Sequence, residues 1–132
     1  MEIKFKGKVI FPDLSYKING ILFKTHNQLG NYCNEKQYGD LIEKLLRDNQ
    51  IIFEREKILP VSFVGEKSGR NKVDFLIENK VVLEIKAKEV ITKEDYYQLR
   101  RYLKAFNLKL GIIANFRLKY LHPKRILNSD II

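Results

Sequence analysis

The sequence predicts an α/β domain in which a mixed central sheet is flanked by helices. Two apolar runs, 73–77 and 81–87, face each other across a short polar loop and are typical of a β-hairpin. Runs this apolar indicate strands that are covered on both faces. Helical spacing of apolar residues occurs before and after the hairpin, which predicts helices on both sides of the sheet.

The N-terminal part of the chain predicts a strand followed by helices. Residues 2–11 alternate apolar and polar side chains and predict an edge strand or a small hairpin. Helical spacing begins at Leu14 and ends at Gly30, a residue type that commonly ends helices. Asn34 and Gln37 are spaced as a capping box that begins a second helix. Its buried stripe is expected to consist of Tyr38, Leu41, Ile42, Leu45 and Leu46.

The stretch between the second helix and the hairpin predicts a strand and a basic turn. Residues 51–59 begin the sheet, and 61–64 continue it after a bend at Pro60. The turn at 65–71 brings cations beside the hairpin, where they could contact phosphates or remain solvated. These cations are Lys67, Arg70 and Lys72.

The C-terminal part of the chain predicts a helix between strands. Thr92 is the expected N-cap of a helix over 93–106, which carries a clear apolar stripe. This helix would be a right-handed crossover, so the strand over 108–116 is predicted to lie parallel to the strand over 81–87. Residues 124–128 predict a last edge strand.

Charged residues lie inside the predicted hairpin, with Asp74 in its first strand and Glu84 and Lys86 in its second. A buried carboxylate is costly unless it is paired, hydrogen-bonded or bound to a cation. Because side chains alternate, Glu84 and Lys86 share one face. A two-residue turn would put Asp74 and Glu84 on opposite faces, whereas a three-residue loop at 78–80 pairs them. We expect this loop or an equivalent bulge.

Convergence of the two acids would create a site for a cation. Two carboxylates at close range repel, and one takes up a proton unless a cation lies between them. A hard divalent ion such as Mg²⁺, or Mn²⁺ in its place, prefers oxygen ligands of this kind. Lys86 could then orient a water molecule or stabilise charge on a phosphate. The pattern predicts metal-assisted hydrolysis of a phosphodiester bond.

Asp74 followed by Glu84-Ile85-Lys86 resembles the D…(D/E)xK core of the PD-(D/E)xK nuclease superfamily. Other positions resemble the GxxExxY family within that superfamily, and the similarity covers roughly residues 14–128. The flanking positions that share in it are His26, Leu29-Gly30, Glu35, Tyr38, Gln98 and the run 110–116. Tyr32 stands where the family motif has glycine, so the loop before the second helix departs from the family pattern.

The resemblance implies a restriction-endonuclease-like fold and a divalent-metal site. The implied ligands are Asp74, Glu84, the backbone carbonyl of Ile85, and Glu35 through water. Lys86 would serve the attacking water or the transition state, and Gln98 would place Lys86 or the substrate. The candidates for substrate contact or for support of the ligands are His26, Tyr38, Lys67, Arg70, Lys72 and Arg101.

Several of these candidates also have a purely structural interpretation, which the sequence leaves open. Glu35 lies in the first turn of a helix, where the helix dipole favours an acid. Gln98 fits an ordinary surface position, and Arg101 fits a solvated basic face together with Arg100. A lone histidine near a helix end, such as His26, is often a cap or a hydrogen-bonding core residue.

Composition sets the remaining limits. The 132 residues suit one domain, and the formal net charge of +9 favours an anionic partner such as nucleic acid, although a lysine-rich composition alone would give the same value. A single cysteine, Cys33, excludes an intrachain disulfide framework. The sequence lacks an apolar run of the ~20 residues that span a membrane. We expect a cytoplasmic protein.

Three hypotheses for the function follow. The first is a Mg²⁺-dependent nuclease that acts on nucleic acid, with DNA expected ahead of RNA. The second is a non-catalytic nucleic-acid-binding module with a nuclease-like fold. The third is a structural or protein-interaction domain in which Asp74 and Lys86 form an internal ion pair. A homodimer is compatible with the first hypothesis, because one site of this kind cuts one strand.

Overall fold

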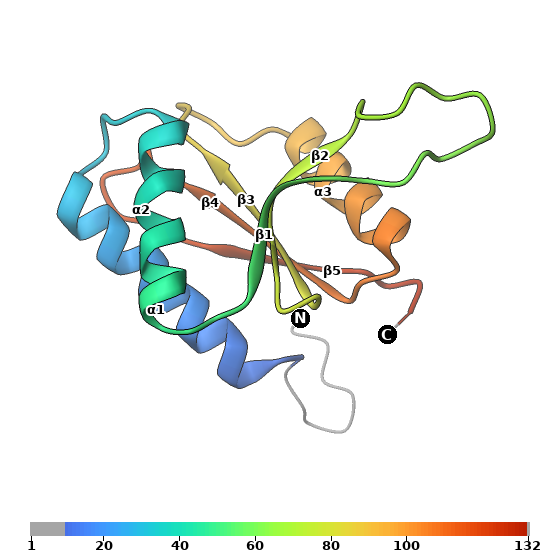
Figure 1. Cartoon of the computed structure of the whole chain (residues 1–132). Coiled ribbons are helices and arrows are strands. Elements are labelled where there is room, and N and C mark those ends of the chain that lie inside the picture. The colour runs from blue at the N-terminus through green and yellow to red at the C-terminus, as the bar shows by residue number, and fades with distance from the viewer. Residues whose placement is uncertain (1–9, 132) are drawn as a thin grey trace.

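A five-stranded mixed sheet lies between helices in the computed structural model, which describes residues 10–131 (Figure 1). The elements are α1 (Pro12–Leu29), α2 (Glu35–Asp48), β1 (Phe53–Ile58), β2 (Lys72–Ile77), β3 (Val81–Lys86), α3 (Lys93–Phe106), β4 (Leu110–Asn115) and β5 (Lys124–Leu127). The strand predicted over 2–11 lies outside the described residues, except for Ile10 and Phe11, which form a bend.

The strands follow one another across the sheet in the order β1-β2-β3-β4-β5. β3 and β4 are parallel, and every other neighbouring pair is antiparallel. The parallel pairing was predicted, because a helix separates these two strands in the sequence. β3 is the central strand, but its pairing with β2 reaches only to Leu83, so Glu84 and Lys86 have a paired strand on the β4 side alone.

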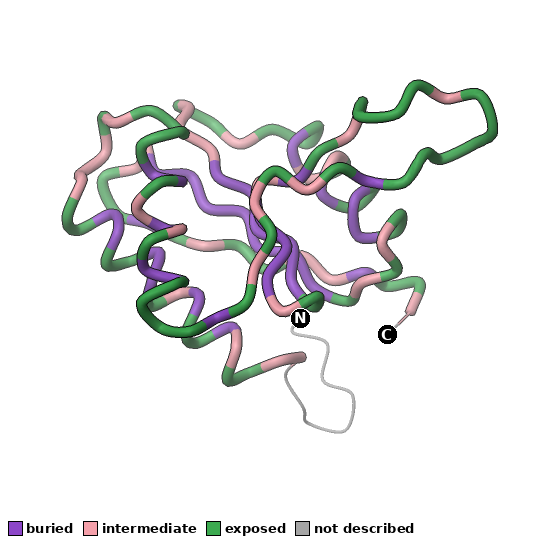
Figure 2. Tube along the Cα trace, in the orientation of Figure 1, coloured by how far each residue is buried: buried purple, intermediate pink, exposed green. Residues whose placement is uncertain are grey.

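Helices α1 and α2 cover one face of the sheet. Pro12 is placed in the first turn of α1, where its missing N–H costs nothing, and the helix ends at Gly30 with a φ of 76°. The capping box of Asn34 and Gln37 begins α2 as predicted. The α2 stripe packs on odd-numbered residues of β2 and β3, such as Phe75 and Leu83, and forms the larger part of the core (Figure 2).

Helix α3 covers the opposite face. A capping box between Thr92 and Asp95 begins it, and Asn107 ends it in the left-handed conformation. Leu99 packs against Gly111 of β4 so closely that a Cβ at position 111 would lie 2.8 Å from the Leu99 side chain. Glycine is therefore required there for α3 to approach the sheet. This packing joins the middle of α3 to β4 at the position that pairs with Val82 of β3.

The strand predicted over 61–64 is wrong. β1 ends at Ile58, and residues 59–71 form a projecting loop that extends beyond the sheet (Figure 1). The loop is closed by a hydrogen bond from the Leu59 amide to the Asn71 carbonyl at 2.9 Å. Leu59 at the base of the loop is buried, whereas Val61, Phe63 and Val64 are exposed. An apolar run forms a strand only where a neighbouring strand pairs with it, and Pro60 removes one of the donors that pairing needs.

Candidate active site at the β2–β3 hairpin

The hairpin loop has the length that brings the two acids together. Ile77 pairs with Val81, so the loop consists of residues 78–80, as expected. Glu78 and Asn79 both adopt positive φ, which lets the chain reverse over so short a distance. In this register Asp74 lies opposite Glu84 across the two strands.

Regular strand pairing stops at Asp74. Val73 packs into the core on the α3 side and Phe75 into the core on the α1–α2 side, although strict alternation would put both on one face. Glu56, the β1 residue across from Asp74, has a φ of 54° and interrupts the ladder on that side. The backbone therefore kinks at the position that carries the acid, a common device for aiming a side chain.

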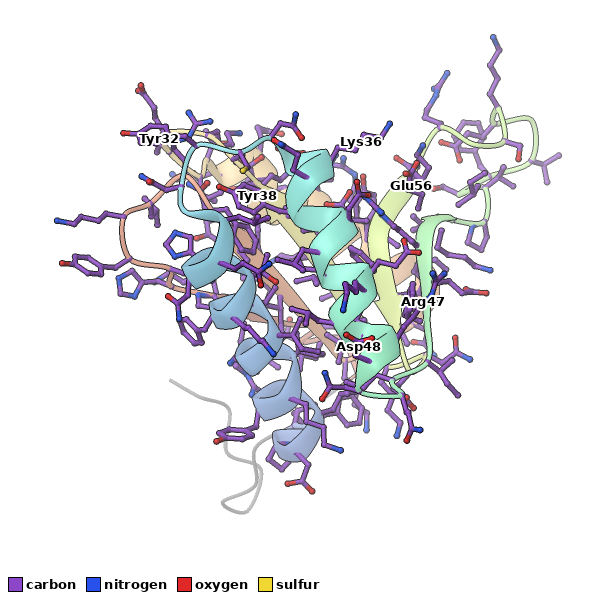
Figure 3. All side chains as sticks on the ribbon, turned by 60° about the vertical axis from the view of Figure 1, so that its left-hand side comes forward. Tyr32, Lys36, Tyr38, Arg47, Asp48 and Glu56 are labelled. Atoms are coloured by element: carbon purple, nitrogen blue, oxygen red, sulfur yellow. The ribbon has the colours of Figure 1, made fainter. Side chains whose placement is uncertain are left out.

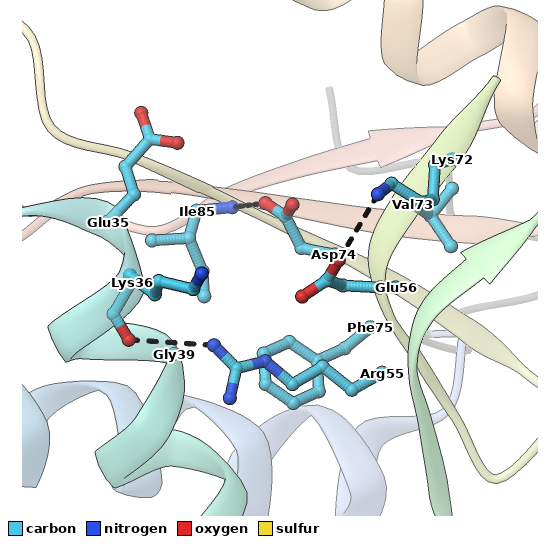
Figure 4. Close-up of a pocket in the computed structure, with 10 residues that line it drawn as sticks. All are labelled: Glu35, Lys36, Gly39, Arg55, Glu56, Lys72, Val73, Asp74, Phe75 and Ile85. Atoms are coloured by element: carbon cyan, nitrogen blue, oxygen red, sulfur yellow. Dashed lines mark hydrogen bonds and ion pairs between the residues drawn. The ribbon is translucent and has the colours of Figure 1, made fainter. Parts of the chain in front are cut away.

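Both carboxylates bind the backbone of the neighbouring strand. The Asp74 amide donates a hydrogen bond to Glu84 Oε2 at 2.9 Å. The Ile85 amide donates to Asp74 Oδ2 at 2.7 Å, as Figure 4 shows. These side-chain bonds take the place of backbone ladder bonds at the end of the β2–β3 pairing. The acids thus converge between the strands, and their positions are fixed by main-chain donors.

Burial and mutual repulsion change the charge of this pair. Glu84 is only 4% exposed, and burial together with the negative charge of Asp74 raises its pKa to about 8. The positive charge of Lys86 acts in the opposite direction but does not outweigh them. Near neutral pH, and without a cation, the Glu84 carboxyl therefore holds a proton. Both carboxyl groups can therefore be ionised together only when a positive charge, such as a bound cation, lies beside them.

Lys86 is drawn toward α3 rather than toward Asp74. Its Nζ lies 3.7 Å from Oδ1 of Asp95, and within residues 10–131 this is the ion pair that Lys86 forms. The internal Asp74–Lys86 pair of the third hypothesis is therefore not formed there. Sequence reasoning treated Asp95 only as a helix cap and missed its contact with Lys86. Burial alone would raise the pKa of Asp95, but hydrogen bonds from Thr92 and Lys88 hold it below its usual value.

Tyr102 and Gln98 stand on the same side of the sheet as the acids. Burial, followed by the negative charge of Glu84, raises the pKa of Tyr102 to about 12, while a hydrogen bond with Gln98 opposes this shift. Tyr102 was missed as a site residue, although it follows Gln98 by one helical turn and so shares its face. Arg101 is exposed and lines a separate surface depression with Lys104, so it does not join this group.

A pocket of about 220 Å³ opens beside Asp74 on the α2 side of the hairpin (Figure 4). Glu35 lines it, and its Oε2 accepts a hydrogen bond from the Ala87 amide at 3.3 Å, with the carboxylate directed away from Asp74. Three cations that line the pocket are Lys36, Arg55 and Lys72. Arg55 is paired with acids of α2, and Lys72 is paired with Glu56. Lys36 and Arg55 were missed by sequence reasoning.

The donor set suits a hard divalent cation only in part. Asp74 and Glu84 provide two converging oxygen donors whose repulsion a cation would relieve. Glu35 is not brought into that pair, and residues 10–131 contain no group of three or more His, Cys, Asp or Glu side chains arranged to hold a metal ion. Mg²⁺ is compatible with two carboxylates, because it commonly keeps several waters.

Tyr38 and His26 are buried, and both bind main-chain groups. Tyr38 is fully buried, and its hydroxyl donates to the Gly30 carbonyl at 2.7 Å and accepts from the Cys33 amide at 3.2 Å. His26 is buried too, with Nε2 2.8 Å from the Leu118 carbonyl oxygen. Figure 3 shows Tyr38 turned inward, whereas Tyr32 stands at the surface. These contacts favour support of the fold around the site, and a role of either residue in the site stays a prediction.

Tyr38→Phe is expected to lower the free energy of unfolding by about 1–3 kcal/mol, because two backbone groups lose their partner in a buried place. The arrangement of Asp74 and Glu84 is expected to stay unchanged, since the hydroxyl serves the loop between α1 and α2. Denaturant unfolding measures the stability, and a crystal structure of the variant shows the arrangement of the acids. A variant as stable as the wild type would contradict this role of the hydroxyl.

The other cations predicted to approach the site are exposed. Lys67 and Arg70 lie on the projecting loop, and Lys72 begins β2 at the rim of the pocket. Lys72 lines the same pocket as Asp74, whereas Lys67 and Arg70 lie farther along the loop.

Comparison with known proteins identifies the family. A family model described as the PD-(D/E)XK nuclease superfamily matches residues 12–126. No curated protein and no solved structure matches the chain. Within the described residues, no helix is long and apolar enough to cross a membrane. The matched residues include both acids, Lys86 and all of the sheet except the last residue of β5, and the chain therefore belongs to the PD-(D/E)XK nuclease superfamily.

Proposed function

We propose that the protein is a metal-dependent nuclease that hydrolyses phosphodiester bonds in DNA, and that it belongs to the GxxExxY branch of its superfamily. The observation that supports this most is the convergence of Asp74 and Glu84, held by main-chain donors beside Lys86. A structural role does not account for the pair, because burying two carboxylates together is unfavourable without a cation.

Each group in the site has a role in this proposal. Asp74, Glu84 and the Ile85 carbonyl would hold Mg²⁺ or Mn²⁺, with Glu35 acting through water. When bound, the metal supplies Lewis-acid activation of the phosphate and of a water molecule. Lys86 stabilises negative charge on the phosphate or orients the attacking water. Gln98 restrains the groups on the α3 side through its hydrogen bond with Tyr102.

The charge of the chain supports a nucleic-acid substrate. The formal net charge is +9, and exposed cations lie on the projecting loop near the acids. We propose that Lys67, Arg70 and Lys72 contact phosphates, which fix the position of the duplex without reading its sequence. Binding should then weaken as salt concentration rises.

The metal dependence of cleavage tests the proposal. Plasmid and oligonucleotide DNA are incubated with the protein during a titration of Mg²⁺ or Mn²⁺, and the products are separated by electrophoresis. Cleavage is expected only with the metal, and Lys86→Ala is expected to reduce its rate about 10²–10³-fold. Lys44→Ala is the matched control, because it removes one exposed positive charge from α2 outside the site.

Other outcomes would select a different function. DNA retention without cleavage at any Mg²⁺ or Mn²⁺ concentration, unaffected by Lys86→Ala, would contradict the nuclease and favour the non-catalytic binding module. Absence of both cleavage and binding would favour a structural or protein-interaction domain.

The domain organisation, the cellular location and the number of subunits are also part of this proposal. We propose that residues 1–132 act as one domain in the cytoplasm. Because one site cuts one strand, a homodimer would supply the second site for a double-strand break. Sedimentation in the presence of a duplex would establish the number of copies that bind.

A further inference from the structure

The N-terminal end of α3 carries a carboxylate that two lysines share. The side chain of Asp95 is only 10% exposed and lies between Lys86 and Lys88, which are the last residue of β3 and a residue just beyond it. Neither lysine is adjacent to Asp95 in the sequence, so the docking of α3 on the sheet creates the contact. This cluster lies outside the pair of acids described above.

Lys88 and the helix cap occupy most of the hydrogen-bonding capacity of Asp95. Lys88 Nζ donates to Oδ1 at 3.1 Å and to Oδ2 at 2.9 Å, and the Thr92 amide donates to Oδ2 at 2.7 Å. The backbone of Lys88 is itself fixed by Asn115 at the end of β4, through bonds of 2.7 and 3.1 Å. Asp95 is therefore held firmly and is largely satisfied before Lys86 approaches it.

Lys86 is attracted to this carboxylate but not bound tightly by it. Its Nζ lies 3.7 Å from Oδ1, which is beyond an ordinary hydrogen bond but well within Coulombic reach. The Lys86 side chain is 18% exposed, so the attraction is screened less than in a surface pair. Such a contact restrains the ammonium group while leaving its hydrogens available to another acceptor.

We propose that Asp95 is a positioning residue that holds the Lys86 ammonium beside Glu84. This inference rests on the proposed nuclease function. Lys88 contributes because it occupies the hydrogen-bonding positions of the Asp95 carboxylate. Lys86 is therefore attracted to Asp95 without forming a short hydrogen bond to it. If a catalytic group moves by about 1 Å, the reaction can lose a large part of its rate enhancement.

Four variants test the role of Asp95. Asp95→Asn keeps an oxygen for the Thr92 amide but removes the charge, and Asp95→Glu keeps both the charge and a residue suited to the capping box. Thr92→Ala weakens the cap alone. Lys88→Met leaves Asp95 free to bind Lys86 more tightly. For each protein, kcat and KM on a DNA duplex with Mg²⁺ are measured, together with the melting temperature.

Asp95→Asn is expected to lower kcat about tenfold while KM changes by less than about twofold. Asp95→Glu should restore most of kcat, and Thr92→Ala should lower the melting temperature without lowering kcat. A kcat of Asp95→Asn equal to that of the wild type would overturn the proposal. An equal loss of kcat in Thr92→Ala would overturn it too, because the helix cap would then explain both.

A second readout is independent of activity. Acetylation of lysines in the metal-free protein is followed by mass spectrometry, with Lys44 as an internal reference. Labelling of Lys86 should increase several-fold in Asp95→Asn and decrease in Lys88→Met. If the wild type labels normally but cuts no DNA, the proposed function fails, and the labelling still decides whether Asp95 holds Lys86. Unchanged labelling in both variants would refute the contact itself.

Discussion

Glu84→Gln is expected to make the metal-free protein more stable and the metal-loaded protein inactive. Above pH 8 the wild-type carboxyl ionises in a buried place beside Asp74, whereas the amide stays neutral. The free energy of unfolding of the variant should exceed that of the wild type by on the order of 1–3 kcal/mol at pH 9. Cleavage should fall by about 10³-fold, because the proposed metal ligand has lost its charge.

The gain in the free energy of unfolding of Glu84→Gln over the wild type should decrease as pH falls. The wild-type carboxyl is protonated below its ordinary pKa of 4.5 in both the folded and the unfolded chain, so the gain should disappear there. Denaturant unfolding at several pH values measures it, with EDTA present. Glu54→Gln is the matched control, since Glu54 forms an exposed pair with Lys57 on β1. A gain that is constant across pH would contradict the buried, proton-binding carboxyl.

The cleavage rate is expected to rise with pH toward about 8 at low Mg²⁺, and the midpoint of this rise should fall as Mg²⁺ increases. The raised pKa of Glu84 means that a proton competes with the cation for the same oxygens. Once the metal is near saturation, each tenfold increase in Mg²⁺ should lower the midpoint by about one pH unit. Initial rates over a grid of pH and Mg²⁺ concentration measure this shift.

The free energy of unfolding of the metal-free wild type should fall as pH rises toward about 8, whereas the cleavage rate rises. The folded state holds a proton on Glu84 that the unfolded chain has lost, so the free energy of unfolding falls as pH rises from 4.5 toward about 8. The slope for one proton is at most about 1.4 kcal/mol per pH unit. Saturating Mg²⁺ should remove this slope. A midpoint of the rate profile that is independent of Mg²⁺ would exclude Glu84 as the titrating ligand.

The hairpin register and the parallel pairing of β3 with β4 could be predicted because they depend on patterns within short stretches of the sequence. The loop at 78–80 lies between two apolar runs. Shifting the register of these strands by one residue would turn buried side chains toward the wrong face of the sheet. The capping boxes that begin α2 and α3 are likewise visible in a few adjacent residues. For these reasons the opposition of Asp74 and Glu84 could be foreseen.

Features that depend on distant contacts could not be predicted. The kink at Asp74 follows from interruption of the ladder at Glu56, which strand alternation does not reveal. The contact of Lys86 with Asp95 depends on how α3 docks on the sheet, and the orientation of Glu35 depends on the amide of Ala87. The residues at 61–64 favour a strand by their β-propensity. This propensity does not indicate whether a partner strand is available to pair with them.

The composition of β1 limits how copies of this chain can associate. β1 is an outer strand of the sheet, and its interior consists of Glu54, Arg55, Glu56 and Lys57. Glu56 interrupts β1 with a φ of 54°, and an irregular, charged edge strand opposes the addition of another strand from a second molecule. A dimer that cuts both strands of a duplex is therefore not expected to assemble by continuing the sheet across the β1 edges of the two subunits.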